Sequence, residues 1–304
     1  MYNQFNSILA SDFDSFTGTV NDTTANKLNT FWGVGYGNAG YGQPQVTPVG
    51  AGNKVNASDW QYLFQYLTSA GSQQNTSTTS IPSVSTGSRI NYISTLSTDL
   101  TNCYNNRLNA NLQGTTSTTT GTRSSSWYQA ITVTHTITFT SGNAARYFFN
   151  AGGQISLNFT LSGGTTPIYT LFQNLANACG TIYLSSPSGS NTATIVGTTY
   201  TGVTKMGGSG SPNTLATGTG YYDLLTTDTI LFKQFATGLT PSGYVNSYIQ
   251  VAAKTNGAQG SNGDKGSIIT ITTTFDEVPD NLTVDGTTSV NCVIRPPSAT
   301  NITN

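Results

Sequence analysis

Apolar residues and threonines alternate almost one for one between Ile131 and Thr140, and this pattern is typical of a sheet. A two-residue period indicates a strand that has one face on a core and the other in water. The same period returns at residues 155–161, after an aromatic run at residues 147–149. Glycines on both sides of the aromatic run favour turns or bulges there. These stretches together predict the nucleus of an antiparallel β-domain.

The rest of the C-terminal half is a series of short strand-like segments. Residues 168–180 interrupt the series with a predicted amphipathic helix, which ends at its last residue, a glycine. The dipeptide Asn262-Gly263 predicts the tip of a hairpin. A last strand is expected at residues 289–295. Short strands at regular spacing predict an antiparallel β-sandwich or jelly-roll-like domain at residues 126–304, with an acidic C-terminal tail.

The first 115 residues have helical periodicity instead. A weak apolar pattern predicts a helix at residues 11–28. A stronger helix follows Asn56 or Ser58, either of which can cap it, and Gly71 is expected to end it. Its apolar stripe consists of Trp60, Leu63, Phe64 and Leu67. A third helix at residues 89–112 has a narrow apolar seam, which suits packing against another helix of this chain or of a neighbouring subunit.

Two segments of simple composition complete the outline. Residues 31–50 alternate glycines with aromatic rings, and we expect an extended arm that lies over another surface. Residues 116–125 are rich in serine and threonine, and we expect a flexible linker. The predicted fold class is therefore α+β and mainly β. An N-terminal arm and helical docking region (residues 1–115) precede the linker and the sandwich.

The composition excludes several classes of partner. Charged residues make up 8% of the chain, against about 25% in average globular proteins. The formal net charge is −1 and no basic run is present, so we expect no binding to nucleic acid or to a membrane surface. The first residues do not resemble a signal peptide, and no apolar run is long enough to span a bilayer. Three widely spaced cysteines predict buried, reduced thiols.

Motifs that carry chemistry are few. Gly35-x-Gly37-x-x-Gly40 matches the dinucleotide-binding pattern, but Gln43-Pro44 follows it instead of a helix, so no cofactor is predicted. The single histidine, His135, lies in mid-strand on the apolar face, which favours a satisfied core residue over a catalytic base. It has no cysteine at a spacing that zinc requires, so no metal site is predicted.

Four acids, Asp276, Glu277, Asp280 and Asp285, form the densest cluster of carboxylates. Paired carboxylates can serve a glycosidase, and carboxylate oxygens can hold calcium. The segment lacks the alternating ligands of a calcium loop, and we expect a solvated acidic connector. No catalytic constellation emerges, so the chain is not expected to be an enzyme.

Three stretches resemble a known family: FTSGNAARYFFNAGGQISLNF at residues 139–159, ISTLSTDLTNCYNNR at residues 93–107 and FDEVPDNLTVDG at residues 275–286. The glycine-tyrosine arm and the helix containing Trp60 add to the resemblance. The family comprises virion structural proteins of tailed bacteriophages, notably the long-tailed phages of marine bacteria such as cyanophages. The resemblance implies a neck, tail or appendage component without catalytic residues.

The sequence thus predicts a non-enzymatic structural component of a tailed-phage virion, at the neck, tail or fibre attachment region. Its expected partners are other copies of itself and other virion proteins, and its expected location is the virion. Rigid aromatic residues carry much interface energy, so the expected anchors of this assembly interface are Trp32, Tyr36, Tyr41 and Trp60. The alternative is a host-receptor module that binds a surface glycan through the β-domain. A polysaccharide-degrading tail enzyme is the third possibility.

Overall fold

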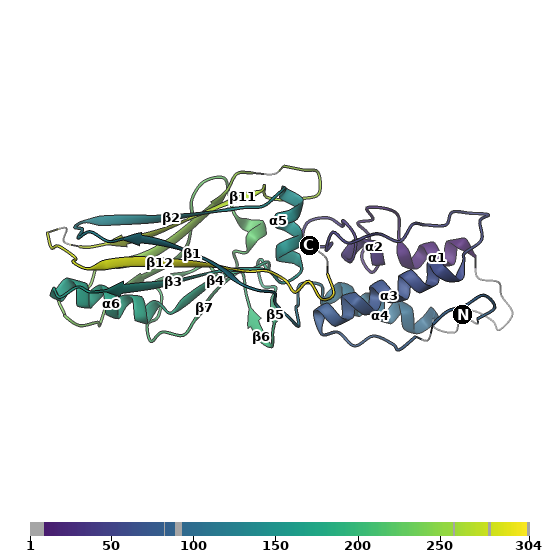
Figure 1. The fold of residues 1–304 in the computed structure, drawn as a ribbon, viewed down its shortest axis with the longest axis horizontal. Helices are drawn as coiled ribbons and strands as arrows, with labels where there is room; N and C mark the ends of the chain where they lie inside the picture. The colour runs from purple at the N-terminus through teal and green to yellow at the C-terminus, as the bar shows by residue number, and fades with distance from the viewer. Residues whose placement is uncertain (1–8, 82, 89–92, 258, 279–280, 303–304) are drawn as a thin grey trace.

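Two regions of different architecture lie end to end in the computed structural model (Figure 1). The structure describes residues 9–81, 83–88, 93–257, 259–278 and 281–302. Helices occupy one end: α1 (Ala10–Thr17), α2 (Leu28–Phe31), α3 (Ala57–Gln74) and α4 (Ile93–Asn105). Two antiparallel sheets form the other end, so the predicted β-rich α+β class is confirmed.

The sandwich consists of two five-stranded sheets. One sheet has, in spatial order, β1 (Ser117–Arg123), β12 (Thr287–Arg295), β3 (Gln154–Ser162), β4 (Thr181–Leu184) and β7 (Val203–Met206). The other has β2 (Ala130–Thr138), β11 (Ile268–Asp276), β10 (Tyr248–Thr255), β9 (Thr229–Phe235) and β8 (Thr214–Leu215). A separate hairpin joins β5 (Ala193–Ile195) to β6 (Thr198–Tyr200).

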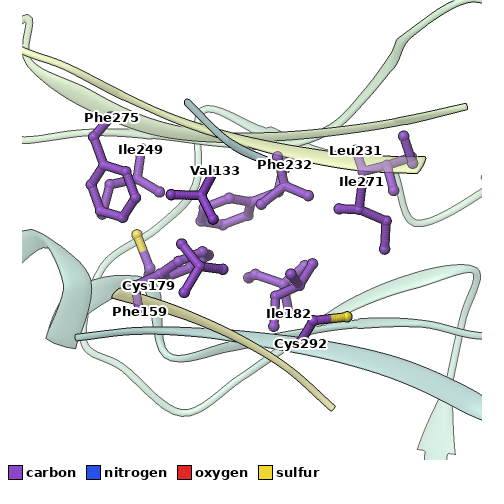
Figure 2. Packing of buried hydrophobic residues seen from close by; sticks show 14 of the residues in the cluster. Val133, Phe159, Cys179, Ile182, Leu231, Phe232, Ile249, Ile271, Phe275 and Cys292 are labelled. Atoms are coloured by element: carbon purple, nitrogen blue, oxygen red, sulfur yellow. The ribbon is translucent and has the colours of Figure 1, made fainter. Parts of the chain in front are cut away.

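The apolar residues of the two alternating stretches line the space between the sheets. Val133, Ile249 and Phe275 point inward from one sheet, and Phe159, Ile182 and Cys292 meet them from the other (Figure 2). Helix α6 (Pro167–Cys179) begins at the predicted place and ends at Gly180, whose φ of +64° suits glycine. The two alternating stretches at residues 130–138 and 154–162 belong to different sheets: β2 is the edge of one sheet, and β3 is the central strand of the other.

Several boundaries differ from the predicted ones. The expected turn around residues 141–153 is wrong, because these residues contain helix α5 (Gly142–Asn150), whose cap is Ser141. Helix α3 does not end at Gly71 but continues to Gln74, and Asn75 ends it in the left-handed conformation. Close packing explains the glycine inside the helix, because a Cβ at Gly71 would lie 2.8 Å from the Thr76 carbonyl oxygen and from Thr78 Cγ2.

The helices predicted at residues 11–28 and 89–112 both end earlier than expected. Residues 11–28 hold only α1 and the first residue of α2, because Gly18 leaves the helix with a φ of +75°. Helix α4 ends at Asn105, and the expected start at residues 89–92 lies outside the described residues. The seam of α4, formed by Leu96, Leu100 and Cys103, joins the core that α3 shares with α1 and α2.

The predicted linker and tail are both parts of the sandwich. Residues 117–123 form β1, which pairs along its whole length with β12, because threonine fits a pleated strand well. The last strand, predicted at residues 289–295 within the acidic tail, is confirmed as β12, which lies between β1 and β3. Beyond β12 the chain turns back to the helical region, where Ile302 is buried in the helical core.

Candidate functional site

The junction of the two regions is built around a glycine-rich segment, residues 33–42, which we call the glycine loop. Its ends are held together by two backbone bonds, from the Gly42 N–H to the Gly33 carbonyl at 2.9 Å and from the Gln43 N–H to the Trp32 carbonyl at 3.0 Å. Gly40 has a φ of +91°, and a Cβ there would lie 2.0 Å from the Val34 oxygen. The backbone therefore folds too tightly at this point for any other residue.

Helix α5 holds the glycine loop through a guanidinium. Arg146 is fully buried and donates to the carbonyl oxygens of Val34 (2.6 Å), Gly37 (3.0 Å) and Ala39 (2.6 Å). Its Nε donates to Asn143 Oδ1 at 3.3 Å. No carboxylate forms an ion pair with Arg146 among the residues that the structure describes. The buried charge is satisfied by carbonyl dipoles, and this makes the position of the loop highly specific.

Asn150, one helical turn beyond Arg146, strengthens the same contact. Its Nδ2 lies within 3.1 Å of the carbonyl oxygens of Gly37, Ala39 and Gly40. The Tyr222 hydroxyl completes the group, 2.7 Å from the Gly37 oxygen and 2.8 Å from Asn150 Oδ1. Burial raises the pKa of Tyr222 well above its usual range, so the hydroxyl remains neutral. We call Arg146, Asn150 and Tyr222 the junction clamp.

The other side of the glycine loop is tied to the helical region. Arg107 Nε donates to the Asn38 carbonyl at 3.0 Å and its Nη2 to Asn38 Oδ1 at 2.9 Å. The Tyr41 hydroxyl donates to the Arg107 carbonyl at 2.6 Å and accepts from Gln74 at 2.7 Å. Hydrogen bonds from both the helical region and the sandwich therefore hold residues 33–42.

Three of the four predicted interface anchors do not lie on the surface. Trp32, Tyr41 and Trp60 are 4%, 0% and 4% exposed, and all three belong to the core of the helical region. This corrects the expectation of an arm that lies over a neighbouring copy, because the chain covers these rings with its own residues. Trp32 stacks on Tyr66 with ring centroids 5.2 Å apart. Tyr36 alone remains 56% exposed, so the structure does not bring the four residues to one site.

Tyr36 lines a cleft of about 550 Å³. The cleft is formed where the glycine loop meets the β10–β11 connection, and the Gly37 N–H donates to the Asn262 carbonyl at 2.8 Å. Thr226, Thr227, Asp264 and Lys265 also line it. Asp264 is buried, and its Oδ2 accepts the N–H groups of Gln259 and Gly266 at 2.8 and 3.3 Å. An aromatic ring, hydroxyls and a carboxylate thus converge on one hollow.

A second, more apolar cleft of about 670 Å³ lies on the other side of α5. Its walls come from α5, from the segment after β2 and from the chain after β12, and its lining includes Phe139, Tyr147, Phe148, Pro296, Pro297 and Ile302. These residues sit where the two regions meet.

Strand β1 ends its sheet with an open edge. Six of its seven residues are exposed, and Gly121 is half-buried. In the part of the chain that the structure describes, its backbone pairs only with β12. Strand β2 forms the edge of the other sheet, and Gly121 packs on Val133 of β2. Both sheets therefore end side by side.

The titratable candidates are engaged in structure. His135 is buried as predicted, but the expectation that it is satisfied is wrong, because neither ring nitrogen has a well-placed partner among the described residues. Burial lowers the pKa of His135, and the backbone of Thr119 and Val290 opposes the shift only in part. All three cysteines are free and buried as predicted. Burial raises the pKa of Cys103 to about 12 and of Cys292 to about 11, so both remain thiols.

The acidic segment is not simply a solvated connector. Glu277 is fully buried and accepts the Leu282 N–H at 3.2 Å, while Asp280 lies outside the described residues. Asp285 accepts the Thr166 hydroxyl at 2.6 Å and the Thr165 N–H at 2.8 Å, at the start of α6. These bonds, above all that from the Thr166 side chain, hold the pKa of Asp285 well below its usual range. Asp285 therefore serves as a structural anchor for the helix.

Among the residues that the structure describes, no group of three or more histidine, cysteine or acidic residues is arranged to hold a metal ion. Among the same residues, no helix combines the length and the apolar character that crossing a bilayer requires. Comparison of the chain with protein family models, curated proteins and solved structures gave no match.

Sequence reasoning missed the junction clamp. Arg146 and Asn150 stand four residues apart, the spacing that places two side chains on one face of a helix. The apolar residues Ala145, Phe148 and Phe149 show the same helical period on an adjacent face, and Ser141 is a good cap. The neighbouring glycines favour turns, and they outweighed this helical signal in the prediction. The carbonyl acceptors on the glycine loop had no signal in the sequence at all.

Proposed function

We propose that this chain is a non-enzymatic structural subunit of a tailed-bacteriophage particle, placed at the neck, tail or fibre attachment region. The phage assignment rests on the sequence resemblance. The structural role is supported by the junction clamp, in which a buried guanidinium fixes a helical region and a β-sandwich end to end. An elongated body with a specific, polar, largely buried joint keeps a fixed distance between its two ends. That property suits a spacer or connector between other proteins.

The location of the protein on the particle tests the proposal. Intact phage is labelled with an antibody against residues 126–304, and the gold is located by electron microscopy. We expect label at the neck or along the tail. Particles without label, from a lysate that contains the protein, would overturn the virion role.

A second function, binding of a host surface glycan, is favoured by the cleft at Tyr36. An exposed aromatic ring stacks on the apolar face of a sugar, while Thr226, Thr227 and Lys265 offer hydrogen-bonding groups to its hydroxyls. Tyr36→Ala should then abolish binding of the purified chain to host polysaccharide in isothermal titration calorimetry. Tyr128→Ala is the matched control, because Tyr128 is 62% exposed and does not line the cleft. Label at the distal fibre tips would also favour this function, and equal binding by the two variants would exclude the cleft.

A further inference from the structure

Strand β1 has the properties of an unprotected sheet edge. Natural proteins blunt long edge strands with lysine, proline, bulges or short length, because an open row of N–H and C=O groups pairs with other chains. The sequence of β1 is Ser-Thr-Thr-Thr-Gly-Thr-Arg, without proline, lysine or acid. Its pairing with β12 runs over all seven residues without a register shift. By contrast, the edge strands β7 and β8 are four and two residues long, and the remaining edge, β2, has nine residues of which three are buried.

We propose that β1 pairs with β1 of a second copy of this chain, joining two sandwiches across a two-fold axis. The inference rests on the proposed structural role, for which it supplies a contact between copies. Strand addition at an open edge is a common mode of recognition, in which backbone hydrogen bonds supply the affinity. Association of identical subunits across a two-fold axis requires a self-complementary surface.

The register of the pair follows from symmetry. Opposed residue pairs along two antiparallel strands alternate between hydrogen-bonded and non-hydrogen-bonded. If the two-fold axis passed between two neighbouring residues, two successive pairs would be identical by symmetry, which this alternation forbids. The axis must therefore place one residue of β1 opposite the same residue of the second copy. Thr120 is the middle of β1, and a pair centred on Thr120 uses every residue of the strand. Thr118 then lies opposite Thr122 of the second copy, and cross-strand threonine pairs stabilise a sheet.

Charge and shape are compatible with this register. Arg123 is the only charged residue of β1 and would face Ser117 of the second copy, so no like charges oppose each other. The strands run along the long axis and the helical region lies at one end (Figure 1). An antiparallel pair therefore places the two helical regions at opposite ends, where they do not collide.

The outer face of the sheet carries a polar ladder up to the proposed contact. Asn291 donates to Asn158 Oδ1 at 2.9 Å, and the Thr120 hydroxyl donates to Asn291 Oδ1 at 2.7 Å. These three residues lie on neighbouring strands in register. With Thr120 at the two-fold axis, the ladder continues into the same residues of the second copy. The contact extends both the backbone pairing and the row of side-chain hydrogen bonds.

Cysteine cross-linking of the purified full chain tests the pair. Directly opposed residues have Cβ atoms about 4.5–5.5 Å apart, so a short bifunctional thiol reagent should link Thr120→Cys into a covalent dimer. Thr122→Cys is the matched control, because its two copies would lie about 13 Å apart along the strands. The native cysteines are buried, so the unsubstituted chain should not be linked. Hydrogen exchange on the unsubstituted chain should show β1 amides that become protected as concentration rises.

The remaining outcomes count against the proposal. A chain that is monomeric by analytical ultracentrifugation at high concentration, with no link at Thr120, would overturn it. Equal linking at residues 120 and 122 would reflect random collision and would overturn the register. Linking at Thr134→Cys, the middle of β2, without linking at Thr120 would move the contact to the other edge strand. Failure here with gold label on the particle would leave the structural role standing and remove only this contact.

Discussion

The glycine loop and strand β1 both come from segments of simple composition, and the fold uses them in opposite ways. The glycine loop is held by side chains: Arg146, Asn150 and Arg107 all donate to its backbone. Strand β1 is held by a backbone ladder on one side and leaves its other side open. The comparison teaches that a segment without a hydrophobic pattern can still be fixed, if its carbonyl groups meet donors that are themselves buried.

The largest expected effect comes from removing the clamp. Arg146→Met keeps much of the side-chain volume but leaves the carbonyls of Val34, Gly37 and Ala39 without their donor. We expect the free energy of unfolding to fall by about 3–5 kcal/mol, measured by urea denaturation. Arg123→Met on the exposed β1 is the control and should change it by less than about 0.5 kcal/mol. If both variants lost a similar free energy of unfolding, the claim that side chains hold the glycine loop while backbone bonds hold β1 would be refuted.

The next effect tests how tightly the glycine loop is folded. Gly40→Ala brings a methyl group against the Val34 carbonyl at a φ of +91°, and we expect a loss of about 2–3 kcal/mol. Gly37→Ala meets no atom within 4 Å, so only its φ of +54° opposes the change, at about 1 kcal/mol. Thermal unfolding of both variants measures the difference. If Gly37→Ala were the less stable of the two variants, the clash with the Val34 carbonyl would not be the main reason that position 40 requires glycine.

A smaller effect is expected on β1 itself. Gly121 packs on β2, and a Cβ there would lie 2.3 Å from Val133 Cγ1. Gly121→Ala should therefore cost about 1–2 kcal/mol through local overpacking. Thr122→Ala, on the opposite face, should stay within about 0.5 kcal/mol. Chemical denaturation measures the free energy of unfolding of both variants. Equal values would mean that Gly121 is not tightly packed against β2.

The smallest expected effect is a pH dependence that arises beneath β1. His135 has a folded-state pKa below its ordinary value of 6.5, because burial disfavours the charged ring. Above pH 6.5 the ring is neutral in both states and adds no dependence. As the pH falls below 6.5 the unfolded chain takes up a proton that the folded chain does not, so stability decreases until the folded pKa is reached. His135→Leu should reduce the slope of the free energy of unfolding against pH between pH 7 and 5. An unchanged slope would mean that other titratable groups cause the pH dependence.

Local rules were sufficient where one face of an element is apolar and the other polar. The alternation at residues 131–139 located β2, and the period around Trp60 located α3 with its Asn56–Asp59 capping box. The buried cysteines followed from their number and spacing. In these elements, burial of the periodic face and the local propensity favour the same structure. Helix α5 failed this test, because the glycines beside it favour turns although its own residues favour a helix.

By itself, the sequence determined the class of the fold, the β-rich C-terminal half and the helical N-terminal region, since hydrophobic period is a local property. Only the tertiary structure decided that Tyr41 is buried while Tyr36 is exposed, that residues 117–123 form a strand and that Arg146 joins the two regions. These outcomes depend on partners more than 100 residues away, at β12 for β1 and at α5 for the glycine loop. A carbonyl group has no sequence signal, because every residue carries one, so the site where the guanidinium binds appears only when the chain is folded.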